Sequence, residues 1–342
     1  WWVEILFENI ITRLDIKWCN IVILTSRYDN TLKKYEKFWN VEIYRVGNNR
    51  YDFMFYSLWK WYNLAKKVDI IHTTTYNSAI PSSIIGFLSK KEVVITVHEI
   101  FWKLWYKFMW WKWFFFKLFE DLIFKFPFSK YLCVSNYTKN SIRLAYWIND
   151  DKLTTIYNGI DYDKWNKLNY DIKDINEVKI NYNLDNFYTG LYFWRPGISK
   201  WLEYYIKSIP SILKKIPEFK AVLIVPESDE NRILFIKNLI KEYKIENNII
   251  WIWGVDNTKL WNYILWCDFT IVPSLAEWFW FAAVEVCSLW KKLIASEISS
   301  LPEVVSGNIN FIDPWSIENI VSAVTKFKEN DFIRIPAKRF EW

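Results

Sequence analysis

The stretch 274–291 reads SLAEWFWFAAVEVCSLWK and follows a short apolar run at 269–272. A Pro-Ser pair ends that run, and helix-forming residues begin near Phe281. This order predicts a strand, then a loop, then a helix. Glu277 should lie in the loop at the carboxyl end of the strand, and Glu285 about two turns into the helix.

The two carboxylates are eight residues apart, a spacing that does not place both on one helix face. We expect them instead to flank one ligand, with the free amides of the helix start between them. Such amides attract phosphate groups. The alternative is a pair of solvated surface carboxylates, which is the ordinary state of glutamate.

A second loop carries two cations. The segment 190–203 reads GLYFWRPGISKWLE, so a strand ends, Arg195 and Lys200 follow, and a helix begins. Two cations in such a loop can hold a diphosphate and offset the charge that develops on a leaving nucleotide, with no metal required. The alternative is a turn with two exposed cations.

In the first half of the chain, the apolar runs 69–71 and 93–97 read as buried parallel strands. His72 and His98 come at their ends and are the only two histidines. Polar groups at strand carboxyl ends line the ligand crevice of open α/β sheets. Each histidine can equally be a hydrogen-bonded structural residue.

The composition indicates a globular chain of two domains. It has 342 residues, of which 52% are hydrophobic, and its net charge of +6 permits an anionic partner. Four scattered cysteines without a CxxC pair favour reduced thiols over disulfides or a zinc site. No apolar run reaches the ~18 residues of a membrane span and no signal peptide opens the chain, so we expect a cytoplasmic protein.

Tryptophan and glycine counts are abnormal, at 24 and 7. Parallel βα folds need glycine at tight turns and helix ends, where φ is positive. Several tryptophans stand where glycine is expected. We therefore hypothesise that many are glycines encoded by UGA, which some bacteria read as glycine; the alternative is a protein rich in tryptophan with strained turns. The clearest positions are Trp147, Trp194, Trp290 and Trp315.

The segment 101–126 reads FWKLWYKFMWWKWFFFKLFEDLIFKF, with five lysines among many aromatic residues. This pattern is typical of an amphipathic helix at a membrane surface, with lysines reaching anionic lipid. We expect peripheral contact with the inner face of the cell membrane through this segment. The alternative is a helix packed over the domain core with a solvated edge of lysines.

The stretch 273–285 resembles the motif P-S-x-x-E-G-F-G-x-x-x-x-E, the donor site of retaining glycosyltransferases of family 4. Both glutamates are present, and tryptophans replace the two glycines. Further segments are similar to other motifs of this family. They are Gly190 to Trp201 (G-R-x-x-x-x-K-G), Thr96 to Glu99 (T-x-H-[DE]), Gly254 and Val255 (the base-contact loop), Asn158 to Asp161 (N-G-[IV]-D), and, if Trp1 and Trp2 are glycines, residues 1–4 (Gly-Gly-x-Glu).

The resemblance implies the GT-B fold: two Rossmann-like domains facing each other across a cleft. The donor would be a nucleotide-diphosphate sugar, UDP- or GDP-linked, with no metal cofactor and no nucleic-acid partner. Catalytic residues would be His98 at the sugar, Arg195 and Lys200 at the diphosphate, and Glu277 at the sugar. Substrate-binding residues would be Trp1, Trp2, Gly254, Val255, Trp278, Phe279, Trp280 and Glu285, the last on the ribose.

The expected domains are 1–165 on the acceptor side, 166–325 for the nucleotide sugar, and a C-terminal helical segment at 326–342. A polar linker is expected at 162–186. Matching residues 1–4 to a loop that follows the family's first strand implies that this strand is missing and the chain is clipped. Residues 339–342 look like the start of a final helix cut short.

The predicted function is retaining transfer of a sugar to an acceptor hydroxyl of a glycolipid or a cell-surface polysaccharide precursor. One alternative is an isomerase on the same fold, such as a nucleotide-sugar 2-epimerase. Another is a protein that binds sugar nucleotides or membranes without catalysis. A metal-dependent GT-A enzyme using Asp161 and Asp163 is the weakest alternative, because D-x-D is common by chance.

Overall fold

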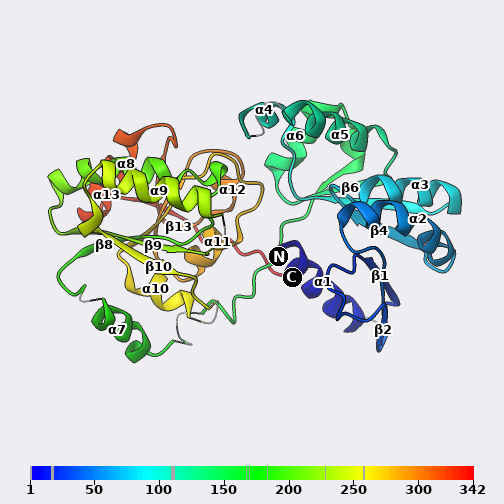
Figure 1. Ribbon diagram of the computed structural model, residues 1–342, viewed down its shortest axis with the longest axis horizontal. Helices are drawn as coiled ribbons and strands as arrows, with labels where there is room; N and C mark the ends of the chain where they lie inside the picture. The colour runs from blue at the N-terminus through cyan, green and yellow to red at the C-terminus, as the bar shows by residue number, and fades with distance from the viewer. Residues whose placement is uncertain are drawn as a thin grey trace. The chain divides into compact units, whose positions relative to one another are not determined.

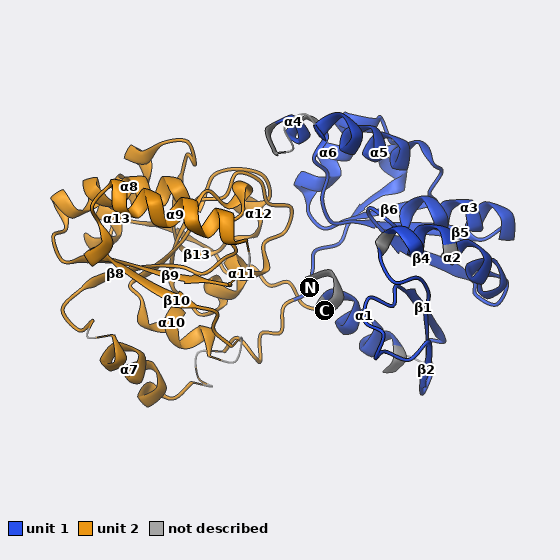
Figure 2. Cartoon of the chain, viewed as in Figure 1, with its two compact units in different colours: residues 1–159, 342 blue, residues 160–341 orange. Residues whose placement is uncertain are grey.

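A computed structural model describes residues 2–16, 19–108, 112–166, 168, 170–182, 184–227, 229–256 and 259–342. The chain forms two compact units, shown in Figure 2. Unit 1 comprises residues 1–159 together with Trp342, and unit 2 comprises residues 160–341. The boundary therefore lies at 159/160, whereas the sequence led us to place it at 165/166. The segment 326–341 belongs to unit 2 and is not separate from it.

Unit 1 is built on parallel strands. A four-stranded sheet has the order β4-β5-β6-β7, and all its neighbours are parallel. A second sheet has the order β1-β3-β2, with β1 and β3 parallel and β2 antiparallel. The strands are β1 Ile21–Thr25, β2 Tyr35–Phe38, β3 Val41–Arg45, β4 Ile70–Thr74, β5 Glu92–Val97, β6 Lys130–Cys133 and β7 Leu153–Thr155.

Helices connect these strands, as parallel pairing requires. Two of them begin with clear caps: Asn49 accepts from two amides of α2, and Ser135 accepts from the Thr138 amide of α6. The core between helices and sheet includes the fully buried Ile85, Ile95 and Ile142. The α-helices are α1 Trp2–Ile16, α2 Arg50–Ala65, α3 Ala79–Ser89, α4 Trp105–Phe108, α5 Trp113–Lys125 and α6 Asn136–Tyr146.

The start of the chain differs from the predicted loop over residues 1–4. Helix α1 begins at Trp2, so residues 2–4 form its first turn. Trp1 lies outside the described residues, and the side chain of Trp2 is not described. Their role in substrate binding stays a prediction.

Unit 2 contains a seven-stranded sheet with the order β10-β9-β8-β11-β12-β13-β14. Every pair is parallel except β13 and β14. The chain runs outward from β8 through β9 to β10, then returns to start β11 on the other side of β8. The strands are β8 Tyr188–Tyr192, β9 Phe219–Val225, β10 Ile249–Trp253, β11 Phe269–Val272, β12 Lys292–Ser296, β13 Gly307–Ile312 and β14 Ile333–Ile335.

Helices cover both faces of this sheet. Right-handed crossovers place helices on opposite faces when the direction of strand addition reverses. Accordingly, α8, α9 and α13 lie on one face and α10 on the other (Figure 1). The helices are α7 Ile172–Asn181, α8 Leu202–Lys215, α9 Glu230–Glu242, α10 Leu260–Trp266, α11 Phe281–Ser288, α12 Leu301–Val304 and α13 Ile317–Lys328.

Two predictions about unit 2 are wrong. The stretch 162–186 is not a simple linker, because it contains α7 and the buried Trp165, Val178 and Leu184. The final residues form no helix: 336–342 have no regular structure and follow β14. Instead of helical bonds, the Phe340 amide donates to Tyr162 Oη at 2.9 Å, and the Phe340 carbonyl accepts from the Ile160 amide at 2.7 Å.

The backbone supports the glycine hypothesis. Among the described residues, ten that are not glycine have positive φ, and five of these are tryptophans. Bulky L-residues avoid this region at about 1–2 kcal/mol each. Trp147 caps the end of α6 at a position typical of glycine, whereas Trp194 and Trp315 are not among the ten. The five are Trp39, Trp102, Trp147, Trp201 and Trp290, with φ between 40° and 57°.

Candidate active site

The sheet of unit 2 has one topological switch point, between β8 and β11. The chain leaves β8 in one direction and β11 in the other, so the segments after these neighbouring strands diverge. Ligands of open α/β sheets bind at such a point, outside the carboxyl ends of the strands. The segments that begin there are 193–200 and 273–280, which carry the predicted cations and Glu277.

Lys200 and Glu277 join the two loops. Lys200 Nζ donates to Glu277 Oε1 at 2.7 Å, although the residues are 77 apart in the chain. The Glu277 side chain is 6% exposed and that of Lys200 is 22% exposed. Burial raises the pKa of Glu277, and the nearby Lys200 ammonium opposes that rise.

Three hydrogen bonds fix the backbone around this ion pair. Leu275 N donates to Ser199 O at 2.8 Å, which links the two loops directly. Ser300 donates to Glu277 O from its amide at 3.1 Å and from its hydroxyl at 2.9 Å. This role of Ser300 was not predicted, because Ser300 lies beyond β12 and outside the motifs of the two loops.

The ring of Trp280 lies beside the same ammonium. Lys200 Nζ is 3.4 Å from the centroid of the Trp280 ring, a cation–π contact. The Trp194 ring packs edge-on against the Trp280 ring, with 5.0 Å between the ring centroids. The buried Trp280 Nε1 has no hydrogen-bond partner among the described residues. This indole therefore occupies space next to Lys200 that a glycine, as in the family motif, would leave open.

Ser274 also lies in this loop, fully buried. Its Oγ has no hydrogen-bond partner among the described residues. Trp278 and Phe279 are buried as well, and the Phe279 ring packs edge-on against Phe340 at 5.5 Å. The loop between β11 and α11 is therefore a packed element, and it leaves polar capacity unused at Ser274.

Glu285 lies in α11, whose first residue is Phe281, so it comes about one turn into the helix rather than two. It is 7% exposed, and burial raises its pKa to about 8, against an opposing effect of Lys164. Burial raises the pKa of the Tyr170 hydroxyl, and the nearby Glu285 charge adds a smaller rise. The hydroxyl of Tyr170 donates to the Lys164 carbonyl.

Lys164 and Tyr170 belong to the segment interpreted from sequence as a linker, so sequence reasoning missed them. Tyr170 also stacks on Trp261 of α10 at 4.5 Å between ring centroids. This stack holds the segment against the body of unit 2. An aromatic residue in a polar stretch was the available signal.

Other predicted residues lie apart from the ion pair or make no contact with it. Arg195 is exposed, and its guanidinium makes no hydrogen bond or ion pair with a described residue. Gly254 follows β10 at φ 34°, its amide donates to Val225 O, and Val255 comes next. Since β10 is the edge strand, Gly254 lies two strands from β8.

In unit 1, His98 directly follows β5 as predicted, whereas His72 lies inside β4 and not at its end. His72 Nε2 hydrogen-bonds Thr96 Oγ1 at 2.7 Å. His98 Nε2 is buried and has no partner among the described residues. Burial, with a smaller effect of His72, lowers the pKa of His98 to about 4, so its ring is neutral near pH 7.

Comparison with protein families matches both halves of the chain. The model described as Glycosyltransferase Family 4 matches residues 3–164, and the model described as Glycosyl transferases group 1 matches residues 187–341. A curated relative, an uncharacterised glycosyltransferase of Methanocaldococcus jannaschii, is 24% identical over 205 residues. That match spans 56% of this chain and 50% of the relative.

Solved structures share the fold. HepE of Anabaena in complex with UDP gives a TM-score of 0.72 at 15% identity, covering 91% of this chain and 90% of that one. The sucrose-phosphate synthase of Thermosynechococcus elongatus gives 0.74 at 17% identity, covering 94% and 84%. The predicted α/β fold with two Rossmann-like domains is confirmed, and the GT-A alternative is wrong. The chain belongs to the glycosyltransferases of the family 4 type and has the GT-B fold.

Proposed function

We propose that the protein transfers a sugar from a nucleotide-diphosphate sugar to an acceptor hydroxyl, with retention of the anomeric configuration. The Lys200–Glu277 pair carries the proposal, because it lies where the strand order of unit 2 reverses. A cation there can stabilise charge on the departing diphosphate. The exposed Arg195 guanidinium, in the same loop, supplies a second cation for the phosphates.

The other site residues take the roles that the family resemblance implies. Glu277 and the backbone of 278–280 hold the sugar, Glu285 accepts from ribose hydroxyls, and Gly254 and Val255 contact the base. His98 offers its neutral, unpartnered Nε2 to a sugar hydroxyl. Because the Arg195 and Lys200 cations can themselves offset the charge of the diphosphate, we expect transfer to continue in EDTA.

The first experiment determines which nucleotide the protein binds. HepE of Anabaena has been solved with UDP and with UDP-glucose, which supports a uridine donor for this chain. We expect calorimetric titration to show binding of UDP and weaker binding of GDP, with Lys200→Ala reducing affinity. Equal, millimolar binding of both nucleotides to wild type and variant would contradict the assignment of the diphosphate to Lys200.

The reaction type is tested by product analysis. With donor and a panel of glycan and lipid-linked acceptors, proton NMR should show a new glycosidic bond with the anomeric configuration of the donor. An epimerase would convert the donor without any acceptor. A non-catalytic binding protein would neither transfer the sugar nor slowly hydrolyse the donor.

We further propose that unit 1 touches an anionic membrane surface through α5, which fits a lipid-linked or polysaccharide-precursor acceptor. Residues 112–116 at its start are all exposed, and Phe114 and Phe115 are 55% and 62% exposed. Lys112, Lys117 and Lys125 accompany these rings. In the described part of the chain, no helix combines the length and apolar character needed to cross a bilayer.

Vesicle sedimentation tests this contact. Wild-type protein should bind vesicles with anionic lipid and lose most binding when Phe114 and Phe115 are both changed to serine. Changing Phe87 of α3, which is 80% exposed, to serine is the matched control and should leave binding unchanged. Equal binding by all three proteins would exclude α5 as the contact.

A further inference from the structure

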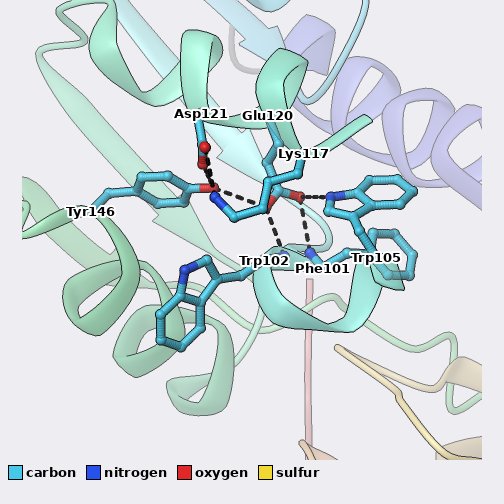
Figure 3. Close-up of polar contacts among 7 residues, drawn as sticks. All are labelled: Phe101, Trp102, Trp105, Lys117, Glu120, Asp121 and Tyr146. Carbon is cyan, nitrogen blue, oxygen red and sulfur yellow. Dashed lines mark hydrogen bonds and ion pairs between the residues drawn. The ribbon is translucent and has the colours of Figure 1, made fainter. Parts of the chain in front are cut away.

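Besides its exposed phenylalanines, helix α5 carries a second feature on its buried side, the carboxylate of Glu120. This side chain is completely buried, and five donors converge on it. Figure 3 draws four of them and omits Tyr76. Three donors reach Oε2 and two reach Oε1. They are Phe101 N (2.9 Å), Trp105 Nε1 (3.1 Å) and Tyr76 Oη (2.8 Å) on Oε2, and Trp102 N (2.7 Å) and Tyr146 Oη (2.9 Å) on Oε1.

All five of these donors are uncharged. Lys117, three residues earlier on the helix, pairs with Asp121 at 2.6 Å, and no lysine or arginine of the described residues pairs with Glu120. A buried carboxylate without a cation is tolerated only when its lone pairs are filled by hydrogen bonds. Here five bonds fill two oxygens that have about four lone-pair sites between them. The arrangement is therefore saturated and leaves no space for a ligand.

The donors come from segments that are distant in sequence, so Glu120 fixes them relative to one another. The amides of Phe101 and Trp102 belong to the segment that follows His98 and Glu99. The hydroxyl of Tyr76, a residue that follows β4, also lies 3.4 Å from the Glu99 carbonyl oxygen, so its one proton is shared between Glu120 and this carbonyl. Two routes, one along the chain from Phe101 and one through Tyr76, thus connect the Glu120 carboxylate with Glu99, the residue that directly follows His98.

We propose that Glu120 is a positioning residue for His98. It anchors the 99–102 segment to α5 and so fixes where the His98 ring points as the chain leaves β5. The inference rests on the proposed function, since it concerns the same histidine and its contact with the donor sugar. It adds a residue that matches none of the motifs used to predict the site.

The direct test is Glu120→Gln. The amide NH₂ must replace one oxygen and then faces donors that it cannot accept from, so at least one backbone amide of Phe101 or Trp102 loses its partner. We expect kcat for sugar transfer to fall about tenfold or more, because a displacement near 1 Å has such effects on positioned groups. The KM for the nucleotide sugar should stay unchanged, since Lys200 and Glu285 are untouched.

A matched pair of milder variants separates positioning from stability. Tyr76→Phe and Tyr146→Phe each remove one hydroxyl bond to Glu120, but only the Tyr76 hydroxyl also reaches the Glu99 carbonyl. Both should lower the melting temperature, and only Tyr76→Phe should lower kcat. If Glu120→Gln does not fold, this pair alone decides the question.

A readout independent of activity uses the fact that the chain has two histidines. Their ring signals in nitrogen–proton NMR are assigned with His72→Gln. Glu120→Gln and Tyr76→Phe should shift the His98 signals and leave those of His72 in place, while Tyr146→Phe shifts neither. Wild-type kcat and unmoved His98 signals in folded Glu120→Gln and Tyr76→Phe proteins would overturn the proposal. A wild-type protein without transferase activity would contradict the proposed function, and the NMR result would still decide the role of Glu120.

Discussion

Two buried glutamates, one in each unit, are satisfied in opposite ways. Glu120 in unit 1 is completely buried and accepts five hydrogen bonds from neutral donors. Glu277 in unit 2 is 4% exposed, and its side chain is held by Lys200, while Ser274 beside it has an unused hydroxyl. The first carboxylate is saturated by the fold. The second depends on one flexible cation and keeps bonding capacity.

This difference separates a structural anchor from a binding site. A saturated carboxylate gains nothing from a ligand, because each new bond would break an existing one. An ion pair with spare acceptor capacity can exchange partners: Lys200 can turn to a phosphate while Glu277 accepts from sugar hydroxyls. The contrast therefore predicts which glutamate responds to substrate.

The largest expected effect comes from Lys200→Ala. Loss of a cation at the leaving group should reduce turnover about 10²–10³-fold. It also leaves Glu277 buried without its cation, so the free energy of unfolding should fall by about 1–3 kcal/mol. Turnover assays and urea denaturation measure the two effects, with Lys214→Ala in the exposed last turn of α8 as control.

Glu277→Gln completes this test as a double-mutant cycle. Combined with Lys200→Ala, it should restore part of the lost stability and none of the lost turnover. If Lys200→Ala proves fully stable and fully active, the contrast between the two glutamates does not hold.

The next effect concerns Glu285, a third buried carboxylate, whose pKa burial raises to about 8. The folded state keeps its proton where the unfolded chain, with a pKa near 4.3, has lost it. Its contribution to stability is therefore full below the unfolded pKa, and declines by about 1.4 kcal/mol per pH unit as pH rises toward 8. Above pH 8 the loss is complete.

Denaturation of wild type and Glu285→Gln at pH 5, 6.5 and 8 measures this slope. The wild-type protein should lose stability relative to the variant at each step. The exposed Glu318→Gln is the control and should run parallel to wild type. Parallel curves for wild type and Glu285→Gln would contradict the raised pKa of Glu285.

The smallest expected effect comes from relieving backbone strain of the kind found next to both glutamates. Trp102 donates to Glu120 and Trp201 follows Lys200, and both have positive φ. Trp147 shares that conformation and is 88% exposed. Its substitution therefore changes backbone strain without changing the packing of the core. Trp147→Gly should raise the free energy of unfolding by about 1 kcal/mol. Trp59 is 81% exposed inside α2, and Trp59→Gly should instead lower the free energy of unfolding by up to about 1 kcal/mol.

The codons at such positions test whether these tryptophans are glycines encoded by UGA. We expect UGA codons at Trp147, Trp201 and Trp290, and mass spectrometry of the native protein should find glycine there. UGG codons at all three would show that tryptophan is native and that the fold tolerates the strain.

The sequence predicted local order well and long-range pairing poorly. Apolar runs and Pro-Ser punctuation placed Glu277 in a loop after a strand and Glu285 in the helix that follows, because these signals act over a few residues. The Lys200–Glu277 bond was not predicted, since it depends on β8 and β11 being neighbours. Sheet order is decided by packing of the whole unit and leaves no mark in either segment.

Glu120 was missed for a related reason. In a stretch of lysines and aromatic rings, a single Glu-Asp pair reads as charge balance on a solvated helix edge. Only the fold shows that Asp121 faces Lys117 while its neighbour is buried under two backbone amides. The linker over 162–186 was misjudged because its composition is polar, although a few apolar side chains are enough to dock it.

The two edges of the unit 2 sheet have unequal consequences for solubility. On one side the antiparallel β14, only three residues long, covers β13 and leaves a short border. On the other side β10 ends the sheet with the apolar sequence Ile-Ile-Trp-Ile-Trp, screened by Lys237 above the rings of Trp251 and Trp253. Short or charged borders resist strand addition, whereas apolar ones invite it. Self-association at high concentration is therefore expected to begin at β10, and removing the Lys237 charge should promote it.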